Sequence, residues 1–190
     1  MKTLYSARGK TAARKLLAAD RGQILRILKK VGTFTGAEVR MAMEIIDSCL
    51  FDEDDEYRFK VAVDCEDRVM GFLCYGRADL SRSYWELYWM AVDPACQRMH
   101  VGELLMKAME SDIMSKKGTN LLIETSSKDI YEAARRFYRR MGYNELLVQK
   151  DFYGAGEDRI TYEKIFETSM NELYLPGIGG RVFQRRWSQK

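Results

Sequence analysis

The sequence is poor in the residues that build metal sites, secreted scaffolds and membrane spans. It contains two prolines, one histidine and four cysteines, the last at positions 49, 65, 74 and 96. The gaps between the cysteines match no zinc-binding spacing, and a single histidine excludes a helix with a two-histidine zinc motif. No apolar run reaches the roughly 18 residues that cross a bilayer. We expect no metal, no membrane partner and a cytoplasmic protein with reduced thiols.

What the sequence does contain is typical of one globular domain. The chain has 190 residues, of which 46% are hydrophobic and 31% charged, and this length suits a single domain. The net charge is +3, but residues 1–19 carry +5 and residues 168–190 carry +3, which leaves −5 for the middle. An acidic body is unlike a nucleic-acid-binding surface. We expect no nucleic-acid partner and interpret the basic ends as solvated termini, with an anionic partner as the alternative.

Apolar periodicity predicts a sheet with helices packed on it. Two helices are expected after capping boxes at Asp20–Gln23 and Thr35–Glu38, preceded by a short strand at Lys15–Ala18. Two more are expected, one ending at Lys116-Lys117-Gly118 and one over Asp129–Met141. Aromatic and β-branched runs predict strands at Tyr57–Cys65, Arg68–Tyr75, Tyr84–Val92, Leu121–Ile123, Asn144–Phe152 and Arg159–Phe166. The order β-α-α-β-β-β-α-β-α-β-β indicates a mixed α/β fold.

The stretch from Tyr88 to Gly102 carries the most chemical information. A predicted strand runs into a loop that opens an amphipathic helix, whose first amides lack partners within the helix. Pro94 fixes the turn that leaves the strand, and Gly102 permits close backbone approach at the helix start. These features alone leave two interpretations open, a phosphate site or a plain β–α turn.

Two motifs resemble those of a known enzyme family. Val92-Asp93-Pro94, followed by Gln97-x-x-His100-x-Gly102, is similar to the acetyl-CoA signature of the GNAT acetyltransferases. That signature runs Gln/Arg-x-x-Gly-x-Gly/Ala after a strand. Ala134 to Tyr143 resembles the family segment Ala-x-x-Phe-Tyr-x-x-x-Gly-Phe. The resemblance implies the GNAT fold, an α/β fold with a mixed central sheet of about seven strands flanked by about four helices.

The resemblance also divides the chain. It implies a basic N-terminal segment at 1–13, a GNAT domain at 14–167 and a C-terminal extension at 168–190. The extension contains Val182, Phe183 and Trp187, so it is either flexible or an arm that docks on a neighbouring subunit. Whether the protein forms a homodimer stays open.

By resemblance, acetyl-CoA is the cosubstrate. The family binds the diphosphate on the loop and helix N-terminus, and the pantetheine arm pairs with the end of the preceding strand, which must splay from Leu121–Thr125. His100 stands at the first family glycine and either fills the loop or donates to a phosphate. Tyr131 stands where many members have a pantetheine-binding asparagine, and it either binds the arm or packs at its helix start. The residues expected to bind are Met90, Ala91, Val92, Gln97, Arg98, Met99, His100, Val101, Gly102, Glu103 and Tyr131.

Catalysis of acyl transfer requires a base, an oxyanion donor and stabilisation of the departing thiolate. Tyr138 resembles the family tyrosine that protonates the thiolate, and the alternative is a core tyrosine. Glu86 is the expected base, because strand alternation predicts that it shares a face with Tyr88, Met90 and Val92. Glu124 is its rival. By analogy, the backbone N–H of Val92 is the oxyanion donor.

The function implied is N-acetyl transfer to a primary amine of a small molecule or peptide, by direct attack on the thioester. An aromatic set is expected either to wall the acceptor site or to pack in the sheet core: Tyr84, Trp85, Tyr88, Trp89 and Tyr153. The loop at 151–158 is expected to close over the acceptor. The alternatives are a non-catalytic acyl-CoA sensor and an adaptor that binds polyanions through the basic ends.

Overall fold

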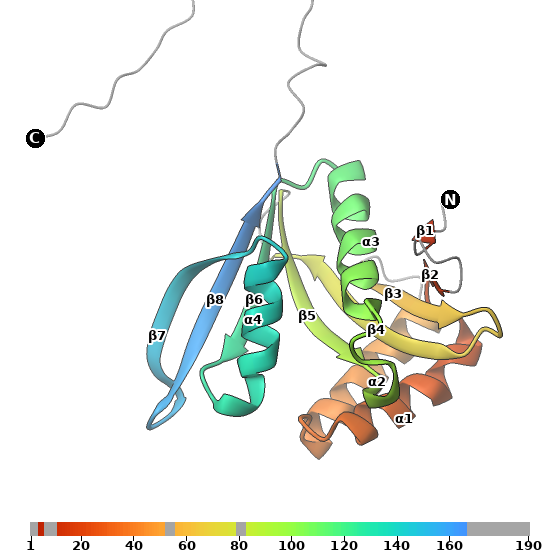
Figure 1. Ribbon diagram of the computed structural model, residues 1–190, viewed down its shortest axis with the longest axis horizontal. Helices are drawn as coiled ribbons and strands as arrows, with labels where there is room; N and C mark the ends of the chain where they lie inside the picture. The colour runs from red at the N-terminus through yellow and green to blue at the C-terminus, as the bar shows by residue number, and fades with distance from the viewer. Residues whose placement is uncertain (1–3, 6–10, 52–55, 79–82, 167–190) are drawn as a thin grey trace, which may run out of the picture.

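The computed structural model describes residues 4–5, 11–51, 56–78 and 83–166, and these residues form one mixed sheet flanked by helices (Figure 1). The strands run in the order β1-β2-β3-β4-β5-β6-β8-β7, and every neighbouring pair is antiparallel except β5 and β6. The strands are β1 (Leu4–Tyr5), β2 (Thr11–Arg14), β3 (Tyr57–Asp64), β4 (Val69–Arg77), β5 (Tyr84–Val92), β6 (Asn120–Ser126), β7 (Asn144–Gly154) and β8 (Glu157–Ile165). The α-helices are α1 (Arg21–Val31), α2 (Gly36–Phe51), α3 (Val101–Ser115) and α4 (Glu132–Arg140).

This architecture confirms the predicted α/β fold. The described strands number eight rather than about seven because the two-residue β1 pairs with β2. Strand β2 begins at Thr11, so sheet residues lie on both sides of the boundary expected at residue 14. The extension expected at 168–190 lies outside the described residues, as does most of segment 1–13.

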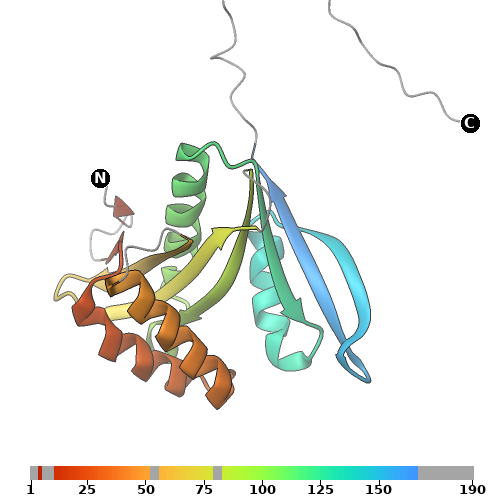
Figure 2. The same cartoon turned by 180° about the vertical axis from the view of Figure 1, so that it is seen from behind.

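The helices cover the two faces of the sheet in pairs. Helices α1 and α2 pack on one face, seen in front in Figure 2, and bury Ile24 and Ile46 against Phe72 of β4. Helices α3 and α4 pack on the other face and bury Leu105 and Tyr138 against the sheet. Fully burying such apolar side chains contributes about 1.5–3 kcal/mol each. Within the described ranges, no helix is long and apolar enough to span a bilayer.

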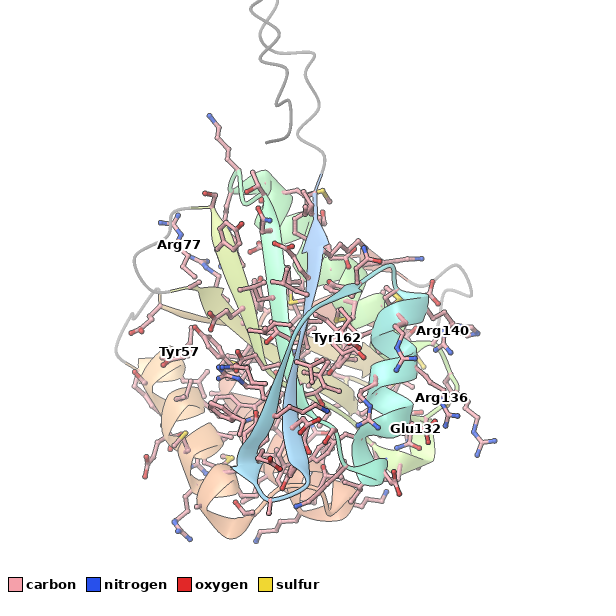
Figure 3. The ribbon with its side chains drawn as sticks, turned by 90° about the vertical axis from the view of Figure 1, so that its left-hand side faces the viewer. Tyr57, Arg77, Glu132, Arg136, Arg140 and Tyr162 are labelled. Atoms are coloured by element: carbon pink, nitrogen blue, oxygen red, sulfur yellow. The ribbon has the colours of Figure 1, made fainter. Side chains whose placement is uncertain are left out.

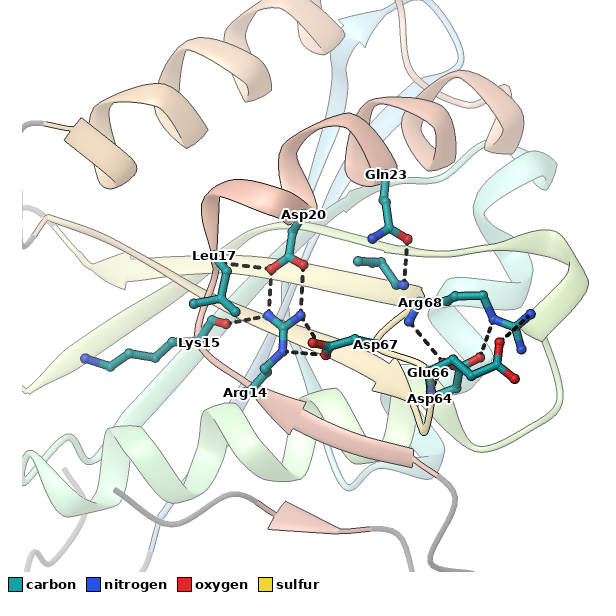
Figure 4. Close-up of polar contacts among 10 residues, drawn as sticks. Arg14, Lys15, Leu17, Asp20, Gln23, Asp64, Glu66, Asp67 and Arg68 are labelled. Carbon is teal, nitrogen blue, oxygen red and sulfur yellow. Dashed lines mark hydrogen bonds and ion pairs between the residues drawn. The ribbon is translucent and has the colours of Figure 1, made fainter.

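The start of the domain differs from the sequence prediction. The predicted strand at Lys15–Ala18 is wrong, because the strand is β2, where Ala13 is buried. The capping box at Asp20–Gln23 is also wrong. The Asp20 carboxylate accepts from the Leu17 N–H at 2.9 Å and binds Arg14, while Gln23 Oε1 accepts from the Val69 N–H (Figure 4). Neither side chain takes part in a capping box, because Asp20 binds Arg14 and the Leu17 N–H while Gln23 binds the Val69 N–H.

Other helix ends follow local rules. The capping box of α2 is confirmed, since Glu38 accepts from the Thr35 N–H and Thr35 accepts from the Glu38 N–H. At the predicted end of α3 the left-handed residue is Lys117, one position before Gly118. A Cβ at Gly118 would lie about 2.4 Å from Ile113 and Trp85, so this glycine is required by packing.

The contact of Arg14 with Asp20 gives a stability prediction. The guanidinium donates to both Asp20 oxygens, at 2.7 and 2.9 Å, and the Asp20 side chain is only 1% exposed. We expect Asp20→Ala to lower the free energy of unfolding by about 2–4 kcal/mol, because it leaves a largely buried cation and the Leu17 N–H without that acceptor. Asp67 also binds Arg14, but its side chain is 70% exposed, so Asp67→Ala should cost under about 1 kcal/mol. Urea denaturation measures both, and equal losses would contradict the assignment.

Candidate active site

The site begins where two neighbouring strands part. Strands β5 and β6 pair over four positions, from Tyr84 opposite Asn120 to Leu87 opposite Ile123. Beyond that point β5 continues to Val92 and β6 to Ser126 without pairing, and Figure 1 shows the two ribbons diverging. From Trp89 to Val92 the edge of β5 that faces β6 has no strand pairing, so it is able to pair with another extended chain.

A bulge in β5 changes which side chains face the splay. Leu87 lies opposite Tyr75 of β4 and Trp89 opposite Cys74, so Tyr88 is an extra residue. Leu87 and Met90 pack toward α3 and α4, whereas both Tyr88 and Trp89 pack toward α1 and α2. The prediction that Glu86 shares a face with Met90 and Val92 is therefore wrong. Glu86 alternates with Leu87 and points to the α1–α2 face, while Met90 and Val92 point to the opposite face.

The main chain at the end of β5 offers donors to the splay. The Asp93 N–H donates to the Met70 carbonyl of β4 at 2.9 Å. Because successive peptide groups of a strand alternate in direction, the N–H of Val92 points away from β4 and toward the side that β6 has left. The expected oxyanion donor is therefore directed into the gap.

The splay opens into a groove with a volume of about 1400 Å³. The groove is formed by β5, the β5–α3 loop, the starts of α3 and α4, the α1–α2 loop and the turn of the β7–β8 hairpin. The predicted site residues that line it are Glu86, Met90, Ala91, Val92, Gln97, Arg98, His100, Val101, Gly102, Glu103, Tyr131 and Tyr138, together with the rival base Glu124. Met99 is not among the lining residues and is 54% exposed.

The loop before α3 is held in a strained conformation. Arg98 and His100 both have left-handed backbones, with φ of 61° and 62°, a region that a glycine enters without cost. The His100 side chain is 72% exposed and lies 3.2 Å from Glu103, so it does not plug the groove. Asp93 anchors the loop by accepting from the Ala95 N–H and from Lys30 of α1. Its contact with Lys30 lowers the pKa of the Asp93 carboxyl.

Gly102 has a packing role at the start of α3. A Cβ there would lie 2.9 Å from Met90 and 3.3 Å from the Phe137 ring. The glycine therefore lets α3 approach both β5 and α4 closely. This agrees with the close approach expected from the sequence, and the approaching groups are side chains of the same domain.

Tyr138 is a buried tyrosine on the wall of the groove. Its ring packs between Tyr143 and Tyr162, with centroids 6.4 and 6.0 Å away. Among the described residues its hydroxyl has no hydrogen-bond partner, and burial raises its pKa to about 12. The phenol is therefore a neutral hydrogen-bond donor at physiological pH.

The two candidate bases lie on neighbouring strands. Glu86 is partly buried on β5, and Glu124 is exposed on β6 with a 3.0 Å ion pair to Arg159. Both carboxylates line the groove, Glu124 with its ion pair to Arg159 and Glu86 together with Tyr88 and Trp89.

The α1–α2 loop contributes to the groove, which sequence reasoning missed. Gly32, Thr33 and Thr35 line it, and so does Glu38. The Tyr131 hydroxyl donates to the Thr33 carbonyl at 3.4 Å, so Tyr131 crosses from α4 to this loop rather than only packing at its own helix start. The capping box at Thr35 predicted the start of α2, but no local signal indicated which part of the sheet the preceding loop would face.

The aromatic wall is smaller than expected. Trp85 is buried in the core under α3, with the Arg58 and Arg77 guanidinium groups over its ring, so the core alternative holds for this residue. Tyr84 does not line the groove, while Tyr88, Trp89 and Tyr153 do. Tyr153 comes from the β7–β8 hairpin within the predicted loop at 151–158.

Comparison with known proteins agrees with this geometry. Residues 55–145 match the family model described as the acetyltransferase (GNAT) domain. A solved structure from Desulfovibrio desulfuricans, assigned to the GNAT family, is 32% identical with a TM-score of 0.77, covering 82% of this chain and 98% of that one. The chain therefore belongs to the GNAT family of acetyltransferases, which confirms the predicted family and the acyltransferase class.

More distant relatives share parts of the chain or only its fold. An uncharacterised N-acetyltransferase of Methanocaldococcus jannaschii is 30% identical over 94 residues, which span 49% of this chain and 57% of that relative. An aminoglycoside 6'-N-acetyltransferase, solved in complex with coenzyme A, is 17% identical with a TM-score of 0.66, covering 80% of this chain and 96% of that one. The likeness to the aminoglycoside acetyltransferase, at 17% identity, shows a shared fold alone.

The left-handed backbone of His100 gives a second prediction. We expect His100→Gly to leave the free energy of unfolding unchanged or raise it by up to about 1 kcal/mol, because glycine adopts this conformation without strain. His100→Val should lower it by about 1–2 kcal/mol, since a β-branched side chain tolerates φ near 60° poorly. Thermal unfolding of the two variants measures these changes in stability. A valine variant as stable as the wild type would contradict the interpretation that the backbone at His100 is strained.

Proposed function

We propose that the protein is an acetyl-CoA-dependent N-acetyltransferase that acetylates a primary amine of a small molecule or peptide by direct attack on the thioester. The observation that carries the proposal is the splay of β5 from β6, beside a loop that opens α3 and joined to it in one groove. A cytoplasmic location and a homodimer stay predictions.

The residues present fit the cosubstrate. The end of β5 from Met90 to Val92, which does not pair with β6, offers main-chain donors and acceptors to an amide-containing arm. The start of α3 offers amides with the positive end of the helix dipole to a diphosphate. Arg98 and Arg140 line the same groove and add positive charge. In the distant aminoglycoside acetyltransferase, the same fold was solved with coenzyme A.

The chemistry divides among three groups of this chain. Glu86 takes a proton from the ammonium form of the acceptor, since only a neutral amine is nucleophilic. The Val92 N–H stabilises the negative charge that develops on the carbonyl oxygen. Tyr138 donates a hydrogen bond to the departing sulfur. With a pKa of about 12, the phenol is a weaker acid than a thiol, whose pKa is about 8.5, so Tyr138 stabilises the thiolate without giving up its proton.

The charge of the groove favours a cationic acceptor. Glu38, Glu86 and Glu157 line it on the side of the α1–α2 loop and the β7–β8 hairpin. Lys128 lowers the pKa of Glu157, which is thus a carboxylate near neutrality. Tyr88, Trp89 and Tyr153 add aromatic faces that attract cations. The lining acids and aromatic rings suit a cationic amine, and Arg98 and Arg140 suit the phosphates of the cosubstrate.

The direct test is turnover of acetyl-CoA with a panel of primary amines, with acetylated product detected by mass spectrometry. The panel should include small amines, aminoglycosides and peptides. Product formation with any member supports the proposal. Tight binding of acetyl-CoA with no turnover across the panel would instead favour the non-catalytic acyl-CoA sensor.

Replacement of the tyrosine hydroxyl gives a third prediction. We expect Tyr138→Phe to lower kcat by about a hundredfold, since it removes one positioned hydrogen-bond donor, with little change in KM for acetyl-CoA. Because the Tyr138 pKa is raised to about 12, the donor is retained as pH rises. The wild-type kcat should therefore show no loss from phenol ionisation below about pH 11. Steady-state kinetics measures both effects, and an unchanged kcat in the variant would remove Tyr138 from the mechanism.

The two glutamates give a fourth prediction. We expect Glu86→Gln to lower kcat/KM at pH 7 by about ten- to a hundredfold, and the loss should shrink as pH approaches the amine pKa of about 10, where the acceptor needs no base. Glu124→Gln is the matched control and should change kcat/KM by less than about threefold. A pH profile of both variants tells them apart, and the larger loss in Glu124→Gln would transfer the role to Glu124.

A further inference from the structure

A second hollow, the interhelix pocket, lies between α1 and α2 and has a volume of about 650 Å³. The two helices run antiparallel, since Arg21 at the start of α1 pairs with Asp47 near the end of α2. The α1 residues that line the pocket recur every fourth position, at 21, 25 and 29. At a rise of about 1.5 Å per residue the pocket follows α1 for about 12 Å. It is thus long enough for three to four residues of an extended chain, at about 3.3 Å each.

Phe34 connects the interhelix pocket with the active-site groove. Its side chain is partly buried in the α1–α2 loop and lines both hollows. The active-site groove reaches from the splay to this loop and to the β7–β8 hairpin. Figure 3 shows that hairpin in front, with α4 on one side of the sheet and α1 and α2 on the other. A small amine held at the splay occupies the groove alone, whereas a polypeptide is able to continue past Phe34 into the interhelix pocket.

Two cations line the half of the interhelix pocket that lies nearest the α1–α2 loop. Lys29 and Arg40 are exposed and, among the described residues, have no ion-pair partner. The Arg40 guanidinium lies at the first residue of α2, with Nη1 3.7 Å from a Cβ placed on Gly36. The start of α2 adds the positive end of its helix dipole. Glu44 lies one turn further along α2, so the two cations outnumber the acid and suit a carboxylate at this end.

We infer that the acceptor is a polypeptide with an acidic side chain close to its acetylated amine, and that Lys29 and Arg40 bind this side chain in the interhelix pocket. The inference rests on the proposed function and selects the peptide among its acceptors. The chain passes Phe34, its carboxylate meets the two cations, and its apolar side chains contact Leu25 and Val39, which also line the pocket. A small amine makes none of these contacts, so recognition depends on the chain beyond the amine.

The experiment measures kcat/KM for pairs of short peptides that differ only by Glu or Gln at a single position, with that position moved stepwise away from the amine. The wild type should prefer the Glu peptide by about threefold to tenfold in at least one pair. Arg40→Gln and Lys29→Gln should each reduce this preference to below about twofold, through a higher KM for the Glu peptide. Arg26→Gln is the matched control. It removes the same charge from an exposed position of α1 that lines neither hollow, and it should keep the wild-type preference.

The outcomes separate the inference from the proposed function. If the wild type acetylates neither peptides nor small amines, both are overturned. If it acetylates small amines only, or both members of every peptide pair equally, the inference alone is overturned. The same holds if Arg40→Gln weakens both members of a pair by one factor, or if Arg26→Gln also loses the preference. Thermal unfolding of each variant confirms that the kinetics are measured on folded protein.

Discussion

The active-site architecture depends on the failure of β5 and β6 to stay paired. They are the one parallel pair of the described sheet, and their pairing ends at Leu87 and Ile123. A regular ladder would have consumed the main-chain groups of Tyr88 to Val92, and the groove would be filled by hydrogen bonds of the sheet. The extra residue at Tyr88 gives the strand its change of direction and rotates the side chains that follow. One irregularity thus creates the space, the free edge and the arrangement of the lining groups.

The rotation also separates the two sides of the proposed reaction. Glu86 points to the face covered by α1 and α2, and Met90 and Val92 point to the face covered by α3 and α4. The acceptor and the thioester therefore approach the gap from opposite faces of one sheet. Acidic and basic side chains both line the groove, with Glu38 and Glu157 from α2 and β8 and Arg98 and Arg140 from the β5–α3 loop and α4.

The sequence predicted the features that depend on local chemistry. The helices, most strands and the α2 capping box follow from apolar periodicity and from Thr35 with Glu38. Helix α4 ends close to the predicted Met141, where Gly142 adopts a left-handed conformation. The errors arise where tertiary contacts override local preference. Asp20 has the composition of a cap, but Arg14 lies close enough to bind it. A β-bulge has no signature in a run of aromatic residues, so simple alternation wrongly placed Met90 and Val92 on the face of Glu86. The contact between Tyr131 and Thr33 joins residues 98 positions apart, which no local pattern reveals.

The strand order has a consequence for the way the chain reaches this structure. Strands β1 to β5 are neighbours in both sequence and space, so each can pair as it leaves the ribosome. Strand β8 is the last to be made, yet it inserts between β6 and β7 and gives β6 its antiparallel neighbour. During synthesis, β6 therefore lacks a neighbour on that side until residue 165 has emerged. The half of the domain that bears Glu124 and Tyr153 is completed last, and a nascent chain interrupted before β8 exposes the edge of a central strand.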